Sequence, residues 1–143
     1  MASFIYNSFW YDLATGAIDI DTDTFKVLLI ASTYPASDET AKDSDLKRSA
    51  VSNECPATGN YATGGNSATF TATKDTANNR LDISCGGTSW SSSTISATKA
   101  VYYKSRGGAS SADELVCLID FGGTIATTNG TFTLTASTVR IQN

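Results

Sequence analysis

Residues 67–84, SATFTATKDTANNRLDIS, decide the fold class of this chain. Ala68, Phe70 and Ala72 alternate with serine and threonine, which is the period of a strand with one buried face. The run RLDIS repeats this period, and the turn-forming residues of KDTANN separate the two runs. The stretch therefore predicts a β-hairpin whose apolar face is turned toward a core.

The second half of the chain continues the strand pattern. KAVYYKS (99–105) and ELVCLIDF (114–121) are apolar on both faces, which predicts central strands that are covered on each side, joined by the flexible loop RGGASSAD. TFTLTAS and TVRIQ alternate again, after the tight-turn signal TTNG. The residues predicted to face inward in these two runs are Phe132, Leu134, Val139 and Ile141.

These runs predict a mainly β chain, a single antiparallel β-sandwich of about seven or eight short strands. Jelly-roll and immunoglobulin-like topologies both remain open. Residues 1–16 are predicted to form an aromatic N-terminal arm with a short helix over 6–15 that ends at Gly16. Residues 17–143 then form the sandwich domain, with an irregular segment at 33–66 whose length indicates that it is functional or docks on something.

Three alternating aspartates, Asp19, Asp21 and Asp23, raise the question of a calcium site. In an EF-hand loop that started at Asp19, glycine and glutamate would be required where Thr24 and Ile30 stand. The same letters fit a strand lead-in, with the isoleucines between the aspartates turned to the core, the aspartates turned to water and a buried strand following. An irregular calcium site and an acid/base carboxylate pair both remain open, although nothing else in the chain supplies a pocket for the latter.

Composition narrows the function classes. The chain has no histidine, so it lacks Ser–His and Cys–His nucleophile pairs and the commonest zinc ligand. Its net charge of -4 and its lack of clustered Lys and Arg disfavour nucleic acid as a partner. It has neither a run long enough to span a membrane nor the basic and apolar regions of a secretory signal. We therefore expect a non-enzymatic protein with no metal or cofactor, no membrane partner and synthesis in the cytoplasm.

Several stretches resemble one protein family. In chain order they are YNSFWYDLATGAIDIDTDTFKVLLIASTY, GNYATGGN, SWSSSTISATKAVYY, LIDFGG and NGTFTL. Together they resemble a family of small virion proteins of tailed bacteriophages and prophages, and the resemblance spans nearly the whole chain. It implies a capsid decoration or cement protein, a β-sandwich module that clamps the lattice of the major capsid protein. It implies no catalytic residues.

The function expected from this resemblance is structural. A decoration protein on the capsid surface, made in the cytoplasm of the bacterial host, would bind the major capsid protein and form a homo-oligomer, with a trimer as one candidate. Aromatic residues are enriched in interface cores, so the aromatic N-terminus is the candidate contact surface, unless its helix simply caps the open end of the sandwich. The candidate contact residues are Phe4, Ile5, Tyr6, Phe9, Trp10, Tyr11 and Tyr61.

Two alternative functions stay open. A tail-associated or fibre-associated virion protein would engage the host surface through its loops rather than through the N-terminus. A calcium-dependent carbohydrate-binding module would use aspartate-rich loops and exposed aromatic side chains on the same kind of sandwich.

Overall fold

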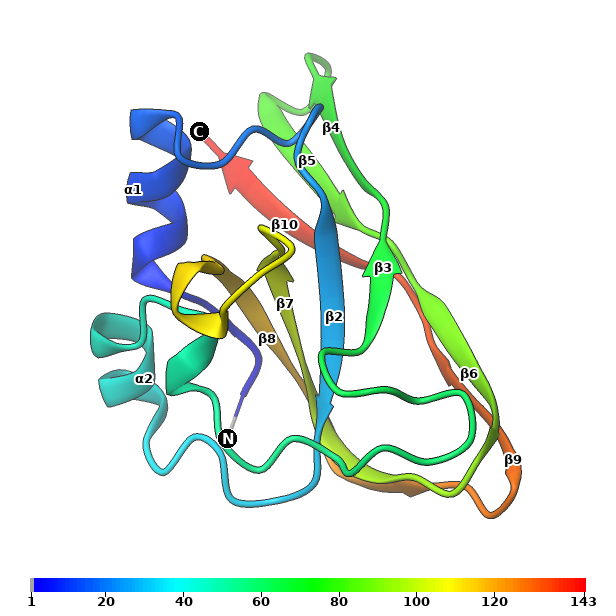
Figure 1. Cartoon of the computed structure of the whole chain (residues 1–143). Helices are drawn as coiled ribbons and strands as arrows, with labels where there is room; N and C mark the ends of the chain where they lie inside the picture. Colours follow the sequence, from blue (N-terminus) through cyan, green and yellow to red (C-terminus); the bar gives the residue numbers. More distant parts are fainter. Residues whose placement is uncertain (1) are drawn as a thin grey trace.

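The structure of the chain is a computed structural model that describes residues 2–143, and Figure 1 shows the arrangement of its elements. Strands predominate and pair in antiparallel fashion, and a short helix lies near the N-terminus, so the predicted fold class is confirmed. The strands are β1 (Phe4–Ile5), β2 (Phe25–Ile30), β3 (Asn66–Ala68), β4 (Phe70–Asp75), β5 (Arg80–Cys85), β6 (Thr88–Ser93), β7 (Ser96–Lys104), β8 (Leu115–Ala126), β9 (Gly130–Leu134) and β10 (Ser137–Gln142). The helices are α1 (Asn7–Thr15) and α2 (Asp38–Ser44), and the single 3-10 turns are Arg48–Ala50 and Ser110–Ala112.

A five-stranded sheet with the order β1-β8-β7-β2-β3 forms the middle of the molecule. The predicted central strands at 99–105 and 114–121 correspond to β7 and the first part of β8, and both are buried on each face. Side chains of β2 alternate between the two faces: Val27 and Leu29 join one core cluster, and Leu28 and Ile30 join another. This alternation explains why the sequence of these strands is apolar without interruption.

The second layer of the sandwich covers one face of this sheet. It contains the predicted hairpin, β4 with β5, extended by β10, and next to it the pair β6 and β9. The chain passes from the first sheet to the second at Thr69, and stacking of Phe25 on Phe70, with ring centroids 4.0 Å apart, joins the two layers. A side chain at Gly87 would collide with the backbone of the neighbouring β9–β10 connection, so glycine is required where β5 leads into β6.

The first part of the irregular segment, residues 33–51, docks on the opposite face of the five-stranded sheet, whereas Cys55 and Tyr61 from its later part join the main core cluster. Tyr34 is buried on that opposite face, and Val51 packs against the same cluster, which also holds Tyr6, Leu28 and others. In Figure 1, α2 and the loops around it lie next to α1, on the side of the sheet away from β4 and β5. The docking that the length of the segment predicted is therefore internal: its first part covers the second face of the sheet, and its later part packs against the main core cluster.

Helix α1 ends as the sequence predicted. Gly16 adopts the left-handed conformation, with φ of 79°, and its N–H donates to the carbonyl of Leu13. Phe9 is fully buried in the main core cluster, against which Trp10 and Leu13 also pack. The helix is thereby tied to the sandwich along this apolar side.

Some local predictions were wrong. Residues 20–23 form a turn rather than an extended lead-in to β2. The TTNG stretch does not close a hairpin, because β8 pairs with β7 and β9 pairs with β6, so the turn carries the chain from one sheet to the other. Ala72 and Ile141 share a face with the buried Ile83 but are exposed: Ala72 lies opposite Ile83 on the edge strand β4, and Ile141 lies two residues beyond the buried Val139 on β10.

Candidate functional site

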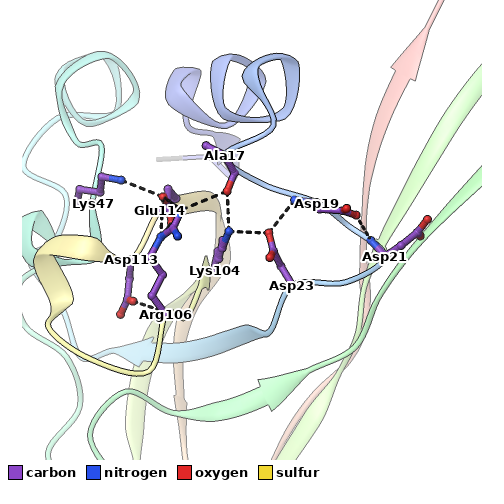
Figure 2. A network of polar contacts seen from close by, with 9 residues as sticks. All are labelled: Ala17, Asp19, Asp21, Asp23, Lys47, Lys104, Arg106, Asp113 and Glu114. Atoms are coloured by element: carbon purple, nitrogen blue, oxygen red, sulfur yellow. Dashed lines mark hydrogen bonds and ion pairs between the residues drawn. The ribbon is translucent and has the colours of Figure 1, made fainter.

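The two ends of the sandwich differ in chemistry. One end gathers an ion-paired network, shown in Figure 2, which we call the ion-paired end: residues 17–23, 46–48 and 104–114. The other end has no Asp, Glu, Lys or Arg side chain, and we call it the uncharged end: residues 55–66, 86–98 and 121–136.

Glu114 is the centre of the ion-paired end. Its side chain is almost fully buried, and it accepts from the Arg106 guanidinium at 2.6 and 3.0 Å and from Lys47 at 3.2 Å. Burial by itself raises the pKa of a carboxyl, but the hydrogen bonds from Arg106 and Lys47 outweigh it and lower the pKa of Glu114. Glu114 is therefore held as a paired carboxylate, which suits a structural ion pair and not a general acid.

Asp113 anchors the other side of the same loop. Its carboxylate accepts from Arg48 Nε at 2.8 Å and from the backbone N–H of Arg106 at 2.8 Å. The Arg48 guanidinium also lies over the Tyr103 ring, 5.0 Å from its centroid. The loop that was expected to be flexible is thus fastened at both of its ends by ion pairs.

The three alternating aspartates serve local structure. The Asp23 carboxylate accepts a hydrogen bond from the backbone N–H of Asp19 at 2.7 Å and pairs with Lys104 Nζ at 2.8 Å (Figure 2). The Asp19 carboxylate accepts a hydrogen bond from the backbone N–H of Asp21 at 2.9 Å. Lys104 Nζ also donates to the carbonyl of Ala17 at 2.6 Å. Within residues 2–143, no group of three or more acidic or cysteine side chains is placed to hold a metal ion.

Hydroxyl and amide groups hold the uncharged end together. Ser93 Oγ donates to the Thr58 carbonyl at 3.1 Å, Asn60 Nδ2 donates to Ser91 Oγ at 2.6 Å, and the N–H of Asn129 donates to Thr94 Oγ1 at 3.0 Å. These bonds join three parts of the chain that are distant in sequence. The end is neutral because its three segments contain no Asp, Glu, Lys or Arg.

The core of the uncharged end is aromatic. Trp90 is fully buried, with its ring centroid 5.4 Å from that of Tyr61 and 6.1 Å from that of Phe132. Gly59, with φ of 52°, lets the loop approach β6 so closely that a side chain would collide with the carbonyl of Ser92. The neutral surface therefore rests on a rigid, well-packed base.

The predicted contact residues fall into three groups. Tyr6, Phe9 and Tyr61 are buried inside the chain, so the prediction that they contact a partner was wrong for these three. Phe4, Ile5 and Trp10 are half-buried and pack against the core clusters. Tyr11 is 70% exposed.

Tyr61 shows why the sequence misled. Its hydroxyl donates to Glu54 Oε1 at 2.9 Å and accepts from the N–H of Leu29 at 3.0 Å, so this tyrosine of the irregular segment attaches the loop to β2.

Leu46, 51% exposed, was missed as a surface residue because it stands among charged residues with no periodic pattern around it. It lines a groove together with Tyr11.

The three cysteines are buried, free thiols. Burial raises the pKa of Cys55 to about 11, and a hydrogen bond with Cys85 together with burial raises the pKa of Cys117. A thiol with a raised pKa carries little thiolate at neutral pH, so these residues act as small apolar core side chains.

Comparison of the chain with protein-family models, with curated proteins and with solved structures found no match. No helix within residues 2–143 combines the length and the apolar character needed to cross a membrane.

Proposed function

We propose that this chain is a non-enzymatic virion structural protein, a capsid decoration protein that binds the lattice of the major capsid protein. The proposal starts from the sequence resemblance to small virion proteins. The observation that supports a particular contact surface is the uncharged end, where three separate segments bring only hydroxyl, amide and apolar groups together.

Such a surface suits a permanent protein contact. Charged side chains are depleted in interface cores because each one must be desolvated or paired when the surfaces meet. A neutral surface avoids that cost, and its hydroxyl and amide groups can still donate and accept hydrogen bonds. One such contact need not be strong, because many copies on a repeating lattice gain from avidity.

Locating the chain in purified particles tests this function. We expect copies distributed over the capsid in numbers comparable to the capsid subunits, seen by labelling with a specific antibody and by quantitative mass spectrometry. A few copies restricted to the tail would overturn the decoration role and support the tail-associated alternative.

Surface variants test the face. Thr131→Lys with Thr133→Lys places two charges on β9 of the uncharged end, at exposed positions, and is expected to abolish binding to particles that lack the protein. The matched control is Thr71→Lys with Thr73→Lys, at exposed positions of the same spacing on β4. Equal binding by both double variants would remove the uncharged end from the proposal.

A further inference from the structure

Exposed apolar side chains form two small patches outside the uncharged end. Tyr11 and Leu46 line one groove, between α1 and the segment that follows α2. Ile141, 41% exposed, lines another together with Leu81, at the tip of the second layer. Leu81 also packs against the main core cluster, but the exposed side chains of Tyr11, Leu46 and Ile141 have no role in the proposed capsid contact.

The Tyr11–Leu46 groove has a volume of about 360 Å³ and contains one acidic group without a cation. Asp12 lines the groove and makes no ion pair with any described residue within 4 Å. Lys47 lines the groove too, but it is engaged by Glu114. Burial raises the pKa of Asp12, and the positive charge of Lys47 offsets this rise only in part.

The tip of the second layer forms a cleft of about 430 Å³, and this cleft contains a cation without an acidic partner. Lys74, Leu81 and Ile141 are cross-strand neighbours in one row, two residues along from the buried Ile83 and on the same face. The row is left open because the β4–β5 hairpin projects past the end of β3, as Figure 1 shows. Lys74 makes no ion pair with any described residue, whereas Arg80 lies 3.1 Å from Asp75 and 3.2 Å from Asp82.

The two surfaces complement each other, and from this we propose that a second copy of this chain docks its β4–β5 tip into the Tyr11–Leu46 groove. Ile141 and Leu81 of one copy cover Tyr11 and Leu46 of the next, and Lys74 supplies the cation that Asp12 lacks. A mostly apolar contact with one ion pair fits the composition of each surface.

This contact is head-to-tail, because the groove and the tip are different surfaces of the molecule. Heterologous contacts of this kind produce a closed ring when the rotation between copies closes, and an open chain when it does not. Six residues line the groove and eight line the tip, against roughly 20–30 residues a side in a standard interface, so a single contact is weak and the assembly gains from ring closure or from a lattice that aligns the copies. The inference does not depend on the identity of the capsid partner.

Crosslinking through introduced cysteines tests the geometry. We expect the double variant Tyr11→Cys with Ile141→Cys, treated with a short bismaleimide, to form covalent multimers that end at one ring size. Each single variant is expected to stay monomeric, because a head-to-tail contact never brings two equivalent positions together. The unsubstituted protein controls for its three buried thiols.

A matched control uses Ile125, which is 49% exposed but lies at the uncharged end. Tyr11→Cys with Ile125→Cys is expected to give no multimers under the same conditions. Equal crosslinking by this variant, or dimers from either single variant, would overturn the proposed contact.

Charge exchange tests the ion pair in the otherwise unmodified protein by sedimentation velocity at high concentration. Asp12→Lys and Lys74→Asp alone are each expected to reduce association at least about tenfold, a loss of ~1.4 kcal/mol, and the double exchange to restore most of it. Lys26→Asp, at a lysine on β2 that also lacks an ion pair with a described residue, serves as the control. A double exchange no better than the single variants, or a fully monomeric unsubstituted protein, would overturn the proposal.

Discussion

The two ends of the sandwich solve the same problem, that of fastening loops to a β-sheet, with different interactions. At the ion-paired end, buried carboxylates of Asp113 and Glu114 bind cations from segments far apart in the chain. At the uncharged end, side-chain hydroxyls and amides bind one another and the loop backbone near the buried Trp90. The difference teaches that the chain uses its charges for internal bonds at one end and leaves the other end neutral.

This division has a consequence for binding. Charged groups that are committed to internal partners offer little to another molecule, and the surface above them remains hydrated. The uncharged end can be covered by another protein without stripping water from an ionised group. Changes at each end are therefore expected to have different signatures, and the variants below separate them.

The largest effect is expected from the core of the uncharged end. Trp90→Ala removes a fully buried ring that packs on Tyr61 and Phe132, and should lower the free energy of unfolding by about 3–5 kcal/mol in urea titrations. The loss should be the same at low and high salt, because no charge is involved. Thr133→Ala, exposed on β9, should change stability by less than about 0.5 kcal/mol. A Trp90→Ala loss similar to that of Thr133→Ala would contradict the packing.

A somewhat smaller effect is expected at the ion-paired end. Asp113→Ala leaves Arg48, which is largely buried, without its carboxylate and should cost about 3 kcal/mol in the same urea titrations. The control is Asp82→Ala, whose ion pairs with Arg140 and Arg80 are partly exposed to solvent, and which should cost less than about 1 kcal/mol. Equal losses of unfolding free energy in Asp113→Ala and Asp82→Ala would show that burial does not make the Asp113 ion pair more important for stability.

The strands were predictable because their signal is local. The sequence pattern of a strand depends on which of its own faces are covered. Alternation in residues 67–84 therefore predicted the hairpin correctly, and the uninterrupted apolar runs of β7 and β8 predicted the central strands correctly. Gly16 was predictable for the same reason, since a helix end needs a left-handed residue wherever the helix lies.

The candidate site was less predictable because it depends on distant partners. Alternation placed Ile141 on the inward face, which is correct, but only the length of the opposite sheet decides whether that face is covered there. Tyr61 was expected at the surface, and its burial follows from the position of Glu54 and of β2. Similarly, no spacing rule brings Arg48 to Asp113, 65 residues away.

Acidification is expected to act chiefly on the ion-paired end, because the other carboxyls with a lowered pKa, Asp75 and Asp82, belong to a surface ion-pair network. The pKa values of Glu114 and Asp23 are lowered from 4.5 and 3.8, so their stabilising contribution is complete above those values and is lost as the pH falls through the lowered ones. Urea midpoints measured from about pH 7 to about pH 3 should therefore fall at the acidic end. Glu114→Gln should flatten that fall, whereas Thr133→Ala should leave it unchanged. An unchanged pH profile for Glu114→Gln would show that this carboxylate is not the group responsible.

The smallest expected effect is that of calcium. Asp23 is already bonded to Lys104 and to the backbone of Asp19, and Asp19 to the backbone of Asp21, so an ion would have to displace these bonds before it gained ligands. Binding of calcium at a hundred times its dissociation constant would add about 2.7 kcal/mol, which corresponds to a rise of several degrees in the melting temperature of a chain this long. We expect a shift of less than about 1 °C between millimolar calcium and chelator in a thermal melt. If the melting temperature rose by several degrees and Asp21→Asn removed that rise, the result would favour the calcium-dependent carbohydrate-binding module. Calcium would then bind at the ion-paired end, where the buried carboxylates are already paired with cations of the same chain.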